Sequence, residues 1–123
     1  DVLAAAEELR ARGPRIVLVT SVVADDMVPD PMRMVAVGEN EAWLVETPLI
    51  ERTFTGSGDL TTAMFLTHWL KTGDLAEALS RTASIVYSIL EETTDAGEQE
   101  LQLVAAQENI VAPKHSFRAI RLS

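Results

Sequence analysis

The residues best suited to chemistry are Gly56, Ser57, Gly58 and Asp59, which read GSGD and lead into an apolar segment. Gly56 and Gly58 have no Cβ, so a ligand can approach their backbone and the turn can adopt conformations closed to other residues. Because the segment that begins near Gly58 has helical spacing, the unpaired N–H groups of its first turn and the positive end of its dipole would face a ligand. The pattern predicts an anion site that suits phosphate.

Asp59 directly follows this turn. A carboxylate beside a phosphate site can take the proton of a hydroxyl group that attacks phosphorus, which predicts phosphoryl transfer with Asp59 as the base. The alternative is structural: Asp59 caps the helix and residues 56–58 form an ordinary tight turn, because Gly-x-Gly-Asp is short and common. A Walker A loop is excluded by the lack of Gly-Lys-Ser/Thr, and Thr61 stands where a dinucleotide fingerprint needs its third glycine.

Helix and strand patterns surround this motif. Helical spacing is predicted over residues 2–12, 60–71, 75–97 and 100–110, and strand patterns over 15–22 and 116–122. Two β-rich runs within 33–50, separated by Gly38, Glu39 and Asn40, predict an antiparallel hairpin. The continuous apolar run RIVLVTSV at 15–22 is typical of a strand buried on both faces, as in a parallel sheet. Together these patterns predict an α/β fold.

The helices on either side of Gly73 have apolar positions at helical spacing. In the first of them, which we expect to be mostly buried, these are Leu60, Ala63, Met64, Leu66, Trp69 and Leu70. In the second they form one stripe of Leu75, Ala78, Leu79, Thr82, Ile85, Val86, Ile89 and Leu90. Gly73 would end the first helix and Asp74 would cap the second.

Composition limits the classes of function. A chain of 123 residues with 47% hydrophobic and 24% charged residues is expected to fold as one domain at most. A net charge of -9, without a cluster of basic residues, argues against nucleic-acid and membrane partners. No apolar stretch reaches the ~20 residues of a membrane span. The absence of cysteine excludes disulfides and thiolate metal sites and favours a cytoplasmic setting.

We expect neither His68 nor His115 to be catalytic or to bind metal, because neither has a partner at ligand spacing.

The stretch TFTGSGDLTTAMFL resembles the Gly-x-Gly-Asp signature of the ribokinase-like sugar and vitamin kinases. Within that superfamily the sequence is most similar to the pyridoxal kinases, because of GSGDL, of IVLVTS at residues 16–21 and of the closing stretch ELQLVAAQENIVAPKHSFRAIRL. The likeness extends from Val2 to Leu122 in the order expected for the C-terminal half of such a kinase. It implies an open α/β sheet flanked by helices, in which residues 1–123 are the nucleotide-binding part and the N-terminal half is absent.

The resemblance also implies roles for particular residues. Asp59 would deprotonate the 5′-hydroxyl of pyridoxal, and the amides of Gly56, Ser57 and Gly58 would stabilise the transferring phosphoryl group. Thr20 and Ser21 would contact the nucleotide phosphates, with Thr20 also near a monovalent cation. The residues implied to lie against the nucleotide base are Thr47, Pro48, Leu49 and Ile50. From the residues alone, the pattern favours hydroxyls that satisfy the backbone at the strand end, with Leu49 and Ile50 as plain core.

The implied activity is ATP-dependent phosphorylation of pyridoxal with Mg²⁺, by a cytoplasmic homodimer when full-length. The Asn-x-x-Glu motif that the family ties to magnesium is absent, since Trp43 follows Asn40 at that spacing and Ala112 follows Asn109. We expect the isolated chain to be inactive, because positioning both substrates supplies much of the catalysis. Two alternatives stay open: another ribokinase-like vitamin or sugar kinase, such as one acting on hydroxymethylpyrimidine, and a non-catalytic acidic α/β interaction domain.

Overall fold

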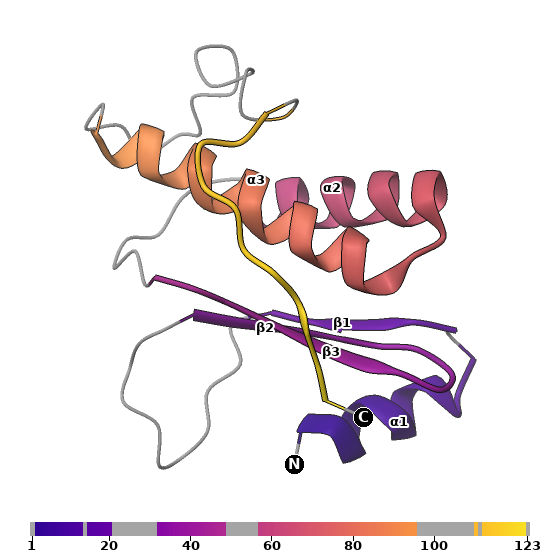
Figure 1. Ribbon diagram of the computed structural model, residues 1–123. Coiled ribbons are helices and arrows are strands. Elements are labelled where there is room, and N and C mark those ends of the chain that lie inside the picture. Colours follow the sequence, from indigo (N-terminus) through magenta and orange to yellow (C-terminus); the bar gives the residue numbers. More distant parts are fainter. Residues whose placement is uncertain are drawn as a thin grey trace.

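The structure is a computed structural model that describes residues 2–13, 15–20, 32–48, 57–95, 110 and 112–122. Its elements are, in order, α1 (Val2–Arg10), β1 (Val17–Val19), β2 (Met32–Val37), β3 (Ala42–Thr47), α2 (Ser57–Thr72), α3 (Leu75–Asp95) and β4 (Ile120–Arg121). Figure 1 shows α2 and α3 on one face of the sheet and α1 on the other. The predicted class, an α/β fold with an open sheet flanked by helices, is confirmed.

The sheet has the strand order β1-β2-β3-β4, and each described pair of neighbouring strands is antiparallel. The predicted hairpin forms between β2 and β3, with Met32 opposite Thr47 and Val37 opposite Ala42. The parallel pairing expected for residues 15–22 is wrong in the described part of the chain, because β1 pairs antiparallel with β2, with Val17 opposite Val37. Sequence pattern reports the burial of a strand and not the direction of its neighbour.

β1 was expected to be buried on both faces and is half-buried instead, although its alternate residues do pack on opposite sides of the sheet. Val17 and Val19 pack against the cluster on the α1 side, whereas Leu18 packs against the cluster on the α3 side. In β2, Val35 belongs to the first cluster and Ala36 to the second. Two covered faces therefore produce a continuous apolar strand in this antiparallel sheet, as they do in parallel ones.

The central helix of the fold is α3, which contacts α2 and the sheet. Its predicted apolar stripe is confirmed, because every member from Leu75 to Ile89 is buried and Leu90 is half-buried. The predicted cap is also present: the amide of Glu77 donates to Asp74 Oδ1 at 3.1 Å. Gly73 ends α2 with a φ of 65°, a conformation that glycine adopts without the steric cost of a Cβ.

The face predicted for α2 is partly wrong. Leu66 and Leu70 are 53% and 74% exposed. The helix instead buries Thr61, Phe65 and His68, and the element it contacts most is α3. Apolar residues occur around much of α2, so their spacing does not determine which side packs inward.

Several expected features lie wholly or partly outside the described residues. These are the helix at 100–110, of which Ile110 alone is described, and the helix end at Gly97. The closing strand is shorter than the predicted 116–122, because only Ile120 and Arg121 pair with β3. No helix in the described ranges has the length and hydropathy to cross a membrane.

Candidate functional site

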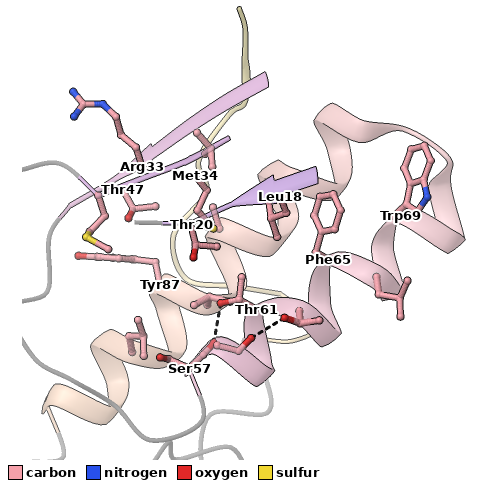
Figure 2. Close-up of a pocket in the computed structure, with 18 of the residues that line it drawn as sticks. Leu18, Thr20, Arg33, Met34, Thr47, Ser57, Thr61, Phe65, Trp69 and Tyr87 are labelled. Carbon is pink, nitrogen blue, oxygen red and sulfur yellow. Dashed lines mark hydrogen bonds between the residues drawn. The ribbon is translucent and has the colours of Figure 1, made fainter. Parts of the chain in front are cut away.

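A groove of about 930 Å³ lies between the sheet and the α2–α3 pair, as Figure 2 shows. The topology explains its position. Because β1 and β3 both run antiparallel to β2, their carboxyl ends lie at the same edge of the sheet, where Thr20 follows β1 and Thr47 ends β3. The first residues of α2, Ser57 and Gly58, line the same groove. Open α/β sheets bind ligands beside the carboxyl ends of strands, so this is the candidate site.

The groove brings together the described residues for which the sequence predicted nucleotide contacts. Thr20, Thr47, Pro48, Ser57 and Gly58 all line it, although they come from three separate segments of the chain. The other residues with that predicted role, Ser21, Leu49, Ile50 and Gly56, lie outside the described residues. Segments far apart in sequence therefore contribute to one site.

Two threonine hydroxyls donate hydrogen bonds to carbonyls in the first turn of α2. Thr61 Oγ1 donates to the carbonyl of Ser57 at 2.8 Å, and Thr62 Oγ1 donates to the carbonyl of Gly58 at 3.0 Å (Figure 2). The first amides of a helix have no acceptor within the helix itself, so those at the start of α2 are candidate donors to a ligand. The turn therefore suits an anion.

Gly58 leaves open space where other residues carry a side chain, but its backbone has an ordinary helical conformation. Among the described glycines, positive φ values occur at Gly13 and Gly73, whereas Gly58 lies in the helix. The backbone freedom expected of Gly58 is therefore not used. A Cβ built on Gly58 would meet no atom of the described residues within 4 Å, which leaves space beside Gly58 on their side of the groove.

Asp59 is the third residue of α2 and is exposed. It lies outside the lining of the groove, immediately after Gly58, which lines it. A negative charge in the first turn of a helix stabilises the dipole by about 0.3–1 kcal/mol. Its position thus suits both a base that acts at the border of the groove and a helix-stabilising charge, although the helix begins too early for Asp59 to be the cap itself.

Sequence reasoning missed several residues that line the groove, notably Arg33, Phe65 and Tyr87. The Arg33 guanidinium is paired with Glu46, with Nε 2.7 Å from Oε2. Tyr87 is the single tyrosine of the chain and follows Val86 of the apolar stripe. The sequence feature that could have drawn attention to Tyr87 is a lone polar aromatic residue next to the apolar stripe of α3.

The two histidines lie outside the lining of the groove. His68 is buried, and its Nδ1 has no hydrogen-bond partner among the described residues. Burial lowers the pKa of His68 below its ordinary value, and the charges of Arg81 and Lys71 lower it further. His115 Nε2 lies 2.6 Å from Glu91 Oε1. That neither histidine is catalytic stays a prediction.

Solved structures share this fold. A pyridoxal kinase from Leishmania donovani, in complex with ADP, aligns with a TM-score of 0.83 at 18% identity, over 99% of this chain and 43% of that one. A Bacteroides thetaiotaomicron protein with the provisional name phosphomethylpyrimidine kinase aligns with a TM-score of 0.79 at 24% identity, over 97% of this chain and 42% of that one. At these identities the likeness establishes the fold alone, and this chain has the fold of part of each neighbour.

Sequence comparison finds relatives of higher identity than these structures. The pyridoxal kinase PdxY of Leifsonia xyli subsp. xyli is 42% identical over 120 residues, which are 98% of this chain and 42% of the relative. The PdxY of Rubrobacter xylanophilus is 48% identical over 122 residues, again 98% of this chain and 42% of the relative. No protein-family model matches the sequence. The expected likeness to the pyridoxal kinases is confirmed: the chain is homologous to them over nearly all its residues and spans about 42% of their length.

Proposed function

We propose that residues 1–123 are the C-terminal, nucleotide-binding part of an ATP-dependent pyridoxal kinase, which forms pyridoxal 5′-phosphate in vitamin B6 salvage. The observation that carries the proposal is the convergence of Thr20, Thr47, Ser57 and Gly58 on one groove at the strand ends. The names of the curated relatives support the substrate, and the ADP complex of the Leishmania donovani neighbour supports a nucleotide ligand.

In this proposal the nucleotide phosphates lie against the first turn of α2. The amides of Ser57 and Gly58, with that of Gly56, donate to the transferring phosphoryl group, and the hydroxyls of Thr20 and Ser21 donate to the other phosphates. Fixed backbone donors stabilise developing charge without having to reorganise during the reaction. The base lies against Thr47 and Pro48, with Leu49 and Ile50 continuing the same wall.

Asp59 is proposed as the base. Its carboxylate takes the proton of the 5′-hydroxyl while that oxygen bonds to the γ-phosphorus, and the bond from the γ-phosphorus to the bridging oxygen breaks and releases ADP. Attacking and leaving oxygens lie roughly in line on opposite sides of phosphorus. The position of Asp59, exposed and outside the groove, suits an alcohol that approaches from the side away from ADP.

Magnesium and the remaining partners belong to the same proposal. Mg²⁺ supplies bridging positive charge between phosphates in phosphoryl transfer. We propose that Mg²⁺ arrives bound to ATP, because Mg²⁺ usually binds through substrate phosphates and few protein carboxylates. Thr20 would also lie near a monovalent cation. The complete enzyme is proposed to be a cytoplasmic homodimer acting on small molecules.

The exposed leucines of α2 support the view that more of the kinase packs here. Leu66 lines the groove and is exposed, and Leu70 is exposed one turn further along the helix. We propose that the remaining part of the enzyme covers this surface and supplies the pyridoxal-binding residues. The chain alone is then expected to bind ADP without turning over.

Nucleotide binding is tested by titrating ADP into the 123-residue chain in a calorimeter, with circular dichroism as the check of folding. Saturable binding is the expected result. A folded chain that binds no ADP would contradict the proposal and favour the non-catalytic interaction domain.

The reaction is tested in a chimera in which this chain replaces the matching segment of the Rubrobacter xylanophilus relative, to which it is 48% identical. We expect ATP-dependent formation of pyridoxal 5′-phosphate. The same chimera, assayed with hydroxymethylpyrimidine and with ribose, separates the alternatives: faster turnover of either would assign the chain to another ribokinase-like kinase.

A further inference from the structure

Tyr87 lines the groove and also contacts the C-terminal segment, defined here as residues 112–122. It projects from α3 into the groove, toward the strand ends that carry Thr20 and Thr47 (Figure 2). The same ring makes edge-to-face contacts with His115, at a centroid distance of 5.1 Å, and with Phe117, at 5.2 Å. One side chain is therefore shared by the candidate nucleotide site and the C-terminal segment.

The C-terminal segment is held on α3 by serine hydroxyls. The amide of Phe117 donates to Ser84 Oγ at 2.9 Å, the amide of His115 donates to Ser88 Oγ at 3.1 Å, and Ser80 Oγ donates to the carbonyl of Phe117. Four residues of a helix rise about 6 Å, close to the length of about 6.6 Å of two extended residues, so serines at this spacing match an extended segment.

The direction of these hydrogen bonds is also determined. Ser84 Oγ donates its proton to the carbonyl of Ser80 at 2.8 Å, and Ser88 Oγ donates to the carbonyl of Ser84 at 2.7 Å. With their protons used inside the helix, both oxygens remain as acceptors for the amides of Phe117 and His115. The segment thus has a single register on α3.

Glu91 links the segment to Tyr87 a second time. Its Oε1 lies 2.6 Å from His115 Nε2, and its Oε2 accepts from the Tyr87 hydroxyl at 3.4 Å. Contacts on the ring and on the hydroxyl therefore both restrict the orientation of Tyr87. An aromatic ring that is positioned before a ligand arrives loses less entropy on binding.

We propose that Tyr87 is an aromatic wall of the nucleotide-base subsite, across the groove from Thr47 and Pro48, and that His115 and Phe117 are positioning residues for it. This inference rests on the proposed nucleotide-binding function. Aromatic side chains stack on bases through their π faces and without regard to the phosphates. Tyr87 should therefore affect the affinity for a nucleoside and not that for a phosphate chain.

The test compares ADP with inorganic tripolyphosphate, titrated into variants of the chain by calorimetry. Tyr87→Leu, which keeps a bulky apolar side chain but removes the ring, is expected to raise the Kd for ADP about tenfold and to leave that for tripolyphosphate within about twofold. Tyr87→Phe, which keeps the ring, is the matched control and should retain most of the ADP affinity. Equal losses for both ligands, or no loss for ADP, would overturn the proposal.

The positioning role is tested with Phe117→Leu, which should weaken ADP binding about threefold without changing tripolyphosphate binding. Ile120→Ala, at a position 57% exposed on β4, is its control and should change neither. If Phe117→Leu binds ADP as wild type does, the segment does not position Tyr87. Failure of the wild-type chain to bind ADP at all would instead reject the proposed function, so the two failures are distinguishable.

Discussion

The amide of Phe117 donates to the hydroxyl of Ser84 at 2.9 Å, although 33 positions separate the two residues in sequence. This bond, with the one from His115 to Ser88, makes the end of the chain part of the α3 surface. An extended segment of this kind would otherwise pair with a strand. Here side chains of a helix satisfy its backbone groups.

Ser84→Ala should lower the free energy of unfolding by about 1–3 kcal/mol, because the amide of Phe117 would lose its acceptor in a partly buried place. Urea unfolding followed by circular dichroism measures this. Ser116→Ala, at an exposed neighbouring position, is the control and should change stability by no more than about 0.5 kcal/mol. Equal stability of the two variants would show that the Ser84 bond contributes nothing.

Asp59→Asn is expected to reduce turnover of the Rubrobacter chimera by about 10² to 10⁴, the usual contribution of a positioned base. ADP affinity should stay within about twofold, since the carboxylate lies outside the groove. Steady-state kinetics and calorimetry measure the two quantities. Turnover within about threefold of wild type would leave Asp59 as a helix-stabilising charge only.

Gly58→Ala should change stability and binding in opposite directions. Alanine is favoured over glycine inside a helix, so the free energy of unfolding should rise by about 0.5–1 kcal/mol. The added Cβ would enter the open space beside the first turn, so ADP should bind more weakly. Urea unfolding and calorimetry on the same sample test both parts. Unchanged ADP affinity would mean that the phosphates do not approach Gly58.

Acidification should destabilise the protein through His68. Burial lowers the pKa of this histidine in the folded state below the ordinary 6.5. The unfolded chain therefore binds the proton more readily, and the stability that neutral His68 contributes above the unfolded pKa is lost as pH falls through the folded pKa. Between about pH 7.5 and about pH 5.5, wild type should lose more free energy of unfolding than His68→Gln. Equal losses would show that His68 titrates normally.

Much of the secondary structure could be predicted from sequence, because its causes are local. The stripe of α3, the cap at Asp74 and the turn at Gly38 depend on residues a few positions apart. The direction of β1 could not be predicted, since a strand covered on both faces has the same pattern in parallel and antiparallel sheets. The face of α2 that exposes Leu66 and Leu70 depends on packing partners and not on spacing.

Some residues of the candidate site could likewise be predicted from sequence, and others could not. The GSGD motif and its likeness to a kinase signature predicted a site at Ser57 and Gly58, which line the groove, because a glycine-rich turn before a helix is a local arrangement. The role of Asp59 stays a prediction. The position of Tyr87 beside the α3 stripe was a weak signal in the sequence, but its place in the groove could not be predicted, because nothing near it in sequence points to Thr47 or to Phe117.

The sequence by itself determined most helices and strands of the described residues, the glycine-rich turn for which we propose phosphate binding and the likeness to pyridoxal kinases. Only the tertiary structure decided that Thr20, Thr47 and Gly58 line one groove, that Asp59 lies just outside it and that the chain end packs on Tyr87. The physical reason is the distance along the chain over which each kind of interaction acts. Backbone preferences and caps act over a few residues, whereas a groove is formed by the packing of segments that the chain keeps far apart.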